Sequence, residues 1–152
     1  MAVDHQRRQI LRAARFMPNV RGVEASTHRV GSREALWLAP ARSRGHGAVL
    51  YLHGGAYVLG SPRTHMNVAS RMARQTGLPV LVPDYPLAPA SRCPAALTDA
   101  RAAWAHLLDC GLPPERIVIA GDSAGGGPVS YTHLRAHETG RHIAYAVFCL
   151  KR

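Results

Sequence analysis

Lysine is almost absent from this chain, which has one lysine, Lys151, beside 18 arginines. Aromatic residues are also scarce, at 6% of the chain, and no apolar run approaches the roughly 20 residues of a membrane-spanning helix. The amino-terminal residues include arginines but no continuous apolar region, so they do not resemble a secretory signal. We therefore expect a cytoplasmic protein that has no membrane partner.

Cysteine occurs only at Cys93, Cys110 and Cys149. No two of these residues form a C-x-x-C pair, and their odd number and scattered spacing favour reduced thiols over a disulfide framework. The cysteines therefore agree with a reducing cytoplasmic compartment and argue against a small disulfide-stapled secreted domain.

Acidic residues are outnumbered, and the formal net charge of the chain is +10. A charge of this size is compatible with a nucleic-acid partner. However, the basic residues form only short runs, such as Arg7-Arg8, and aromatic residues are sparse. We interpret the arginines as a solvated face and expect no nucleic-acid partner.

The hydrophobic pattern predicts one α/β domain, because 152 residues suffice for a single core and predicted strands alternate with predicted helices. Continuous apolar runs at 48–52, 79–83 and 117–120 are typical of strands buried on both faces. This order favours a mainly parallel sheet flanked by helices. Helices are expected at 4–16, at 94–110 and from Ser61-Pro62 to Thr76, with Gly77 ending the last, and two weaker strands at 23–30 and 34–39 around a Gly31-Ser32 turn.

Two glycine-rich motifs directly follow two of the buried strands. The first, HGGAY, occupies residues 53–57, and the second, GDSAGG, occupies residues 121–126. A glycine-rich turn can offer backbone N–H groups to the oxyanion that forms when a hydroxyl attacks an ester carbonyl. A G-x-S-x-G turn between a strand and a helix lifts its serine, here Ser123, above the sheet. The N–H of Ala124 would then lie at a helix amino terminus, which favours negative charge.

The chain resembles the bacterial hormone-sensitive-lipase-like esterases of the α/β-hydrolase fold in four segments, which cover about residues 1–126. These segments are YLHGGAYVLGS (51–61), DYPLAP (84–89), PAALTDA (94–100) and VIAGDSAGG (118–126). The resemblance implies an incomplete α/β-hydrolase that acts on small-molecule carboxylic esters without a metal or other cofactor. It implies Ser123 as the nucleophile and Gly55, Ala56 and Ala124 as the oxyanion-hole residues.

The chain departs from the family pattern at three positions. Ala56 stands where a third glycine is more frequent, Pro86 replaces an arginine, and Ala90 replaces a glutamate. An amide donor survives the change at Ala56, so these departures affect loop packing rather than the reaction class. The remaining motif residues are expected to support the turns, and they are His53, Gly54, Tyr57, Gly121, Asp122 and Gly125.

Some motif residues have a second interpretation. His53 resembles a catalytic base, but in this fold the acid and the histidine follow the serine, so His53 is expected to order its own loop. Asp122 adjoins Ser123 and is expected to serve the turn rather than act as the triad acid. Tyr57 could line a substrate pocket or cover the core. The spacing from Gly55 to Ser61 suggests a phosphate-binding loop, but Ser61 stands where the essential lysine would be.

The family pattern ends near residue 127, so residues 1–127 are interpreted as the amino-terminal part of the domain. Residues 128–152 contain the only lysine and a third of the histidines, and we expect a non-native or frameshifted tail. His133 and His137 have the spacing of a zinc site but lack the glutamate of that motif. If residues 128–152 are such a tail, the triad acid and the histidine are missing and the chain is inactive. Two alternatives are a peptidase or amidase of the same fold and a non-catalytic α/β fragment. The acyl-chain length and the oligomeric state remain open.

Overall fold

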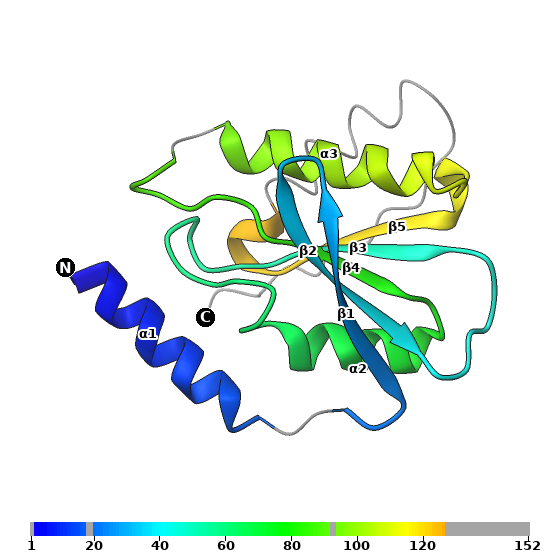
Figure 1. Ribbon diagram of the computed structural model, residues 1–152, viewed down its shortest axis with the longest axis horizontal. Coiled ribbons are helices and arrows are strands. Elements are labelled where there is room, and N and C mark those ends of the chain that lie inside the picture. Colours follow the sequence, from blue (N-terminus) through cyan, green and yellow to red (C-terminus); the bar gives the residue numbers. More distant parts are fainter. Residues whose placement is uncertain (1, 18–19, 92–93, 127–152) are drawn as a thin grey trace.

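The computed structural model describes residues 2–17, 20–91 and 94–126. One five-stranded sheet lies between helices on its two sides (Figure 1). The helices and strands, in chain order, are α1 (Ala2–Arg15), β1 (Val23–Val30), β2 (Arg33–Pro40), β3 (Ala48–Leu52), α2 (Met66–Thr76), β4 (Val80–Pro83), α3 (Ala95–Asp109), the short helix η1 (Pro114–Arg116), β5 (Ile117–Gly121) and the short helix η2 (Ser123–Gly125).

The sheet has the strand order β1-β2-β4-β3-β5. Strands β4, β3 and β5 are parallel, as expected for strands joined through helices. Strands β1 and β2 extend the same sheet in antiparallel fashion, so the sheet is mixed rather than parallel throughout. The predicted Gly31-Ser32 turn makes β1 and β2 antiparallel through a tight hairpin in which Val30 pairs with Arg33, and β2 in turn pairs antiparallel with β4. The predicted α/β architecture is confirmed.

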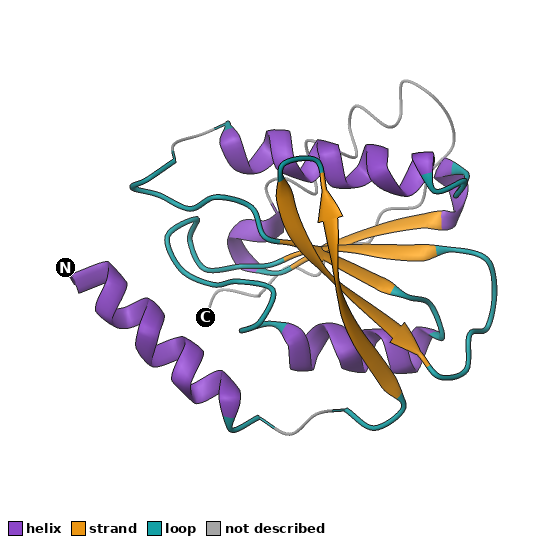
Figure 2. Cartoon of the chain, viewed as in Figure 1, coloured by secondary structure: helices purple, strands orange, loops and turns teal. Residues whose placement is uncertain are grey.

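Two apolar layers cover the faces of the sheet, with α3 on one side and α2 on the other (Figure 2). Strand β3 shows how the layers divide, since Leu50 and Leu52 pack toward the α3 side while Val49 and Tyr51 pack toward the α2 side. All five residues of β3 are buried. Its continuous apolar sequence therefore reflects burial on both faces.

Helix α2 begins later than the sequence predicts, at Met66 rather than at Ser61-Pro62. The Ser61 N–H donates to Thr64 Oγ1 at 2.9 Å, and the Thr64 N–H donates back to Ser61 Oγ at 3.3 Å. These side chains form a separate turn that competes with helix initiation. The predicted end is confirmed, because Gly77 adopts a left-handed conformation and its N–H donates to Ala73 O.

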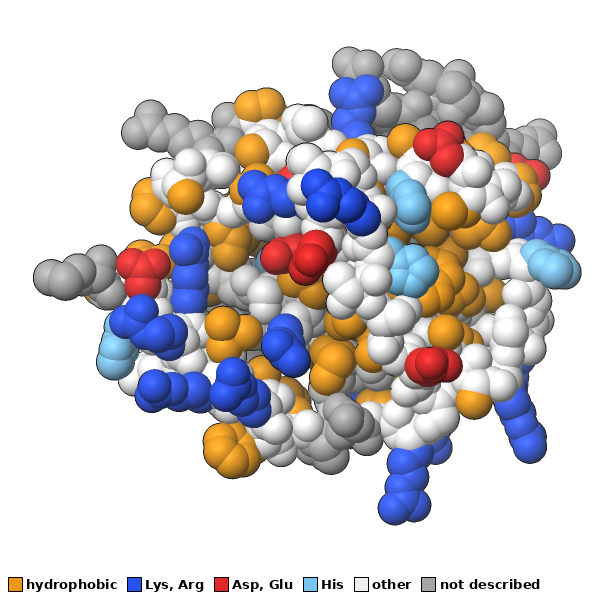
Figure 3. All heavy atoms as spheres, in the orientation of Figure 1, with side chains coloured by type: hydrophobic (Ala, Val, Ile, Leu, Met, Phe, Trp, Pro, Cys, Tyr) orange, Lys and Arg blue, Asp and Glu red, His pale blue; other side chains and the backbone are white. Residues whose placement is uncertain are grey.

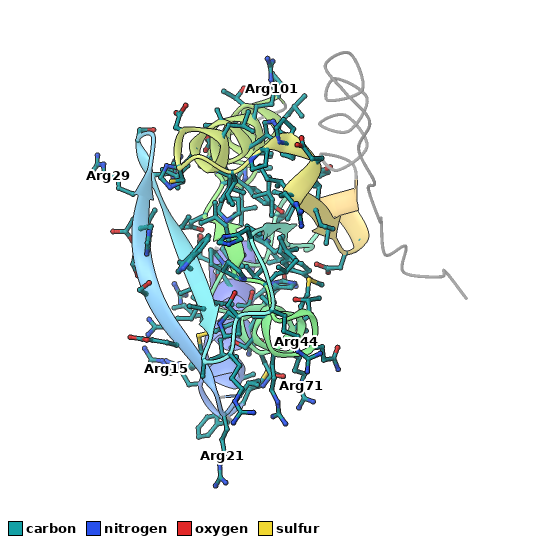
Figure 4. All side chains as sticks on the ribbon, turned by 90° about the vertical axis from the view of Figure 1, so that its right-hand side faces the viewer. Arg15, Arg21, Arg29, Arg44, Arg71 and Arg101 are labelled. Carbon is teal, nitrogen blue, oxygen red and sulfur yellow. The ribbon has the colours of Figure 1, made fainter. Side chains whose placement is uncertain are left out.

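The arginines lie on the outside of the molecule. The space-filling view shows basic side chains gathered over α1 at the lower left (Figure 3). The labelled arginines in Figure 4 project from several sides of the molecule rather than from one face. No residue of α1 is buried, so this helix rests on the surface of the domain.

Candidate active site

Both glycine-rich motifs leave the sheet at the same edge. Strands β3 and β5 are parallel neighbours, and Leu52 pairs with Gly121 at the carboxyl ends of the two strands. The HGGAY loop therefore starts beside the GDSAGG turn, although 68 positions separate His53 from Gly121 in the sequence. Ligands of open α/β sheets bind at this edge, outside the carboxyl ends of the strands.

Ser123 occupies a sharp turn directly after β5. Its φ of 48° lies in the left-handed region, while Asp122 before it is extended. The turn continues into η2, and the Ser123 side chain is exposed. A residue with a Cβ in such a conformation costs about 1–3 kcal/mol, which the surrounding structure must offset.

Close backbone contacts hold this turn against the end of β3. A Cβ added to Gly125 would collide with the carbonyl of Leu52, and a Cβ added to Gly54 would collide with Asp122. Both positions therefore require glycine. The two motifs pack backbone against backbone, which fixes the position of Ser123 relative to the HGGAY loop.

The HGGAY loop has three consecutive residues in left-handed conformations, with φ of 120° at Gly55, 54° at Ala56 and 59° at Tyr57. The Gly55 carbonyl accepts hydrogen bonds from the N–H groups of Val58 and Leu59, at 3.0 and 2.7 Å. Within residues 2–17, 20–91 and 94–126, no acceptor is recorded for the N–H groups of Gly55 and Ala56. The hydrogen bonds of the described residues therefore leave these two amides unused.

Asp122 ties the two motifs together. Its Oδ1 accepts hydrogen bonds from the Gly54 N–H at 2.8 Å and from the Tyr51 hydroxyl at 2.7 Å. Its Oδ2 lies 3.6 Å from Nε2 of His65. Burial acts to raise the pKa of Asp122, but the His65 and Tyr51 interactions outweigh it and lower this pKa to about 2. The carboxylate is therefore ionised, and it joins Gly54, Tyr51 and His65.

His53 lies wholly inside the protein and not in the open part of the site. Its ring stacks on Tyr85 at 4.2 Å and on His65 at 5.3 Å between centroids, and Nδ1 donates to the Gly54 carbonyl at 2.9 Å. Burial is the main reason that its pKa is lowered to about 4. A neutral, enclosed imidazole of this kind orders the start of the HGGAY loop.

His65, whose side chain is 20% exposed, belongs to the same network. Its Nδ1 lies 2.9 Å from Thr64 Oγ1, and its Nε2 faces Asp122. Burial favours the neutral ring, but the hydrogen bond to Asp122 and its charge outweigh this and raise the pKa of His65 above its ordinary value. The His65 ring thus pairs with the Asp122 carboxylate.

The sequence and fold described above match known proteins. Residues 49–150 match the family described as alpha/beta hydrolase fold. The chain belongs to this family. An acetyl-hydrolase from Streptomyces hygroscopicus is 41% identical over 121 residues, which make up 80% of this chain and 40% of that protein. An ethyl acetate hydrolase from Pseudomonas putida is 42% identical over 83 residues, or 52% of this chain and 26% of the relative.

Solved structures place this α/β hydrolase more narrowly. An esterase from the bacterial hormone-sensitive lipase family matches with a TM-score of 0.85 and 35% identity, covering 95% of this chain and 50% of that one. The expected resemblance to this group of esterases is confirmed. The chain spans half or less of the length of these relatives, and it corresponds to their amino-terminal part.

Several residues of the site in this α/β hydrolase escaped the sequence analysis. His65, Tyr51 and Tyr85 belong to the network below the loop, and the Tyr85 hydroxyl donates to the His53 carbonyl. The only sequence signal was the presence of Tyr51 as a polar group in an otherwise aliphatic strand. Nothing in the spacing of His65 or Tyr85 indicated that they would meet Asp122 or His53.

The structure does not test the expected roles of Tyr57 and of the tail. Tyr57 is exposed, and its carbonyl accepts from Ala88, which does not decide whether its ring contacts substrate. In the described part of the chain, no group of three or more potential ligands could hold a metal ion, and no helix is long and apolar enough to cross a membrane. The expected tail at 128–152, with His133 and His137, lies outside the described residues.

Proposed function

We propose that this α/β hydrolase acts on carboxylic esters, with Ser123 as the nucleophile. One observation carries the proposal: the exposed, left-handed Ser123 stands at the end of β5, beside a loop whose Gly55 and Ala56 amides have no recorded acceptor in the described structure. The Ser123 oxygen would add to the ester carbonyl. The resulting oxyanion would accept hydrogen bonds from Gly55, Ala56 and Ala124.

Acyl transfer also needs a base that takes the proton from Ser123 and returns it to the leaving alcohol. The histidines nearest the site are unsuitable, because His53 is buried and neutral and His65 is committed to Asp122. Asp122 is itself engaged with Gly54 and Tyr51. We propose that base and acid come from segments outside residues 2–126, and that the chain as printed turns over esters negligibly.

The names of the relatives suggest short acyl groups. One relative is an acetyl-hydrolase and another is an ethyl acetate hydrolase. We therefore propose esters of acetate and other short acids as the substrate class.

The test compares the 152-residue chain with a chimera that joins residues 1–126 to the part of the Streptomyces acetyl-hydrolase that follows its aligned segment. Both are assayed with p-nitrophenyl acetate. The chain should hydrolyse this ester no faster than its Ser123→Ala variant. The chimera should be active, and Ser123→Ala should lower its kcat by about 10⁴-fold or more.

Ser43→Ala is the matched control, because Ser43 is exposed and, among the described residues, its hydroxyl bonds only to the nearby Gly45 carbonyl. This variant should leave the chimera unchanged. An active chimera that tolerates Ser123→Ala would refute Ser123 as the nucleophile. A Ser123-dependent rate in the 152-residue chain would show that the chain supplies its own base.

A further inference from the structure

The residues that bring the HGGAY loop back toward the sheet contact a second loop. The Ala88 N–H donates to the Tyr57 carbonyl at 2.7 Å, which joins the HGGAY loop to the segment after β4. This contact lies directly after the three left-handed residues at 55–57. The left-handed segment is thus fixed at its start by Asp122 and at its end by the 84–91 loop.

An arginine from the distant helix α1 bonds to both loops. Arg7 Nε donates to the Val58 carbonyl at 2.9 Å, and Nη2 donates to the Ala88 carbonyl at 2.7 Å. The third nitrogen, Nη1, lies 3.8 Å from Asp4 Oδ1. Each guanidinium nitrogen therefore faces a different oxygen, and the side chain is 27% exposed.

These contacts form a closed circuit. Arg7 bonds to Val58 and Ala88, Ala88 bonds to Tyr57, and Tyr57 is joined covalently to Val58. Hydrogen bonds from a charged donor are stronger than neutral ones, and the planar guanidinium fixes the directions of both. A lysine at this position carries its three N–H groups on one nitrogen, so it cannot place donors at the two separate positions that Nε and Nη2 occupy.

We propose that Arg7 is a positioning residue that holds the Gly55 and Ala56 amides in place for the oxyanion. This inference rests on the proposed function and assigns a part of the site to helix α1. Arg7 touches no reacting atom and acts through Val58 and Ala88. Loss of the guanidinium would let the left-handed segment relax, because its carboxyl-terminal anchor would be weakened.

The first experiment measures amide hydrogen exchange in the full 152-residue chain. Arg7→Met keeps an unbranched apolar stem and removes the guanidinium donors. It should speed exchange across 54–60 and 86–91 by about tenfold or more, and leave β3 and α3 unchanged. Arg8→Met is the matched control, because Arg8 is an exposed neighbour on α1 that has no recorded bond to a described residue, and it should change nothing.

Arg7→Lys separates directed bonding from charge. If both carbonyls must be held, Arg7→Lys should restore slow exchange in at most one of the two loops. Exchange equal to the original chain in Arg7→Lys, or equal effects of Arg7→Met and Arg8→Met, would overturn the proposal. If Arg7→Met speeds exchange throughout the chain, exchange in Arg7→Lys is compared segment by segment. Equal acceleration of all segments in Arg7→Lys would overturn the local role of Arg7.

The second experiment uses turnover by the chimera. Arg7→Met should lower kcat by about tenfold and change KM by less than about twofold, because the amides serve the transition state more than the substrate. An effect on KM alone would overturn the role in positioning. Exchange needs no turnover, so an inactive chimera with altered exchange at 54–60 would refute the proposed function and leave the contact role of Arg7 intact.

Discussion

Ser123 carries a side chain on a backbone that favours glycine. Its φ of 48° follows an extended Asp122, and close contacts around Gly125 prevent the turn from relaxing. The same conformation exposes the side chain at the edge of the sheet. The strain at this one residue is therefore the cost of exposing a hydroxyl at the end of β5, where the neighbouring strand β3 leads into the HGGAY loop.

Replacement of Ser123 should reveal that strain directly. Ser123→Gly and Ser123→Ala both remove the hydroxyl, but only glycine adopts this conformation without a Cβ conflict. We expect Ser123→Gly to be more stable than Ser123→Ala by about 1 kcal/mol in urea unfolding followed by tryptophan fluorescence. Ser43, which has no positive φ, is the control, and there Ala should be at least as stable as Gly. Equal stability of the two Ser123 variants would contradict strain at this turn.

At the scale of elements, the site depends on how tightly the turn after β5 packs on the end of β3. The Leu52 carbonyl occupies the space that a Cβ at Gly125 would need. Among the residues that the structure describes, no atom lies within 4 Å of a Cβ added to the neighbouring Gly126, whose φ of −63° suits any residue. The two adjacent glycines therefore form a natural pair for comparison.

Gly125→Ala should lower the free energy of unfolding by about 1–3 kcal/mol, since β3 and the turn must separate to admit the methyl group. Gly126→Ala should change it by less than about 0.5 kcal/mol. Urea midpoints of both variants measure the difference. A tolerated Gly125→Ala would mean that the turn is not held against Leu52.

The elements themselves were predictable where one kind of residue dominated. Strand β3 has the predicted bounds because all five residues are apolar and buried. The start of α2 was not predictable, because the Ser61–Thr64 turn depends on side-chain hydrogen bonds that hydrophobic periodicity does not reveal. The place of β1 and β2 in the same sheet also had no signal, because pairing of β2 with β4 joins segments that are distant in the sequence.

On the scale of the whole molecule, three groups in one network should make stability depend on pH, while Asp84, whose pKa burial raises, opposes the loss at acid pH. Asp122 has its pKa lowered from 3.8 to about 2, so it stabilises the fold above pH 3.8 and stops doing so as pH falls toward 2. His53 has its pKa lowered from 6.5 to about 4, so stability also falls as pH drops through that range. His65 has a raised pKa, so its contribution is present below pH 6.5 and is lost as pH rises through the folded value.

We therefore expect the free energy of unfolding to be greatest near pH 6.5 and to fall on both sides. Asp122→Asn should remove the loss below pH 3.8 and flatten the alkaline side, because His65 then has no carboxylate beside it. Asp109→Asn, at the exposed end of α3, is the control and should leave the shape of the profile unchanged. Thermal melts from pH 2.5 to 8 give the profile, and an alkaline limb that persists in Asp122→Asn would contradict the His65–Asp122 pairing.

The candidate site was predictable only where neighbouring residues carry its chemistry. The two motifs revealed the nucleophile turn and the glycine-rich loop because their chemistry is encoded in adjacent residues. The groups that hold those motifs are not adjacent. Tyr51 meets Asp122 across 71 positions and Arg7 meets Ala88 across 81, so only the folded chain brings them together.

The pairing of Leu52 with Gly121 also limits where related sequences can gain or lose residues. Deletion of one residue within β5 would move Ser123 by about 3.3 Å along β3 and turn the side chains of β5 to the opposite faces. Insertions or deletions are compatible with a shared site only in the loops that enter β3 and β5 at the far end of the sheet. Descendants of this sequence should therefore vary in length before these strands and keep a constant count of residues from each strand to its motif.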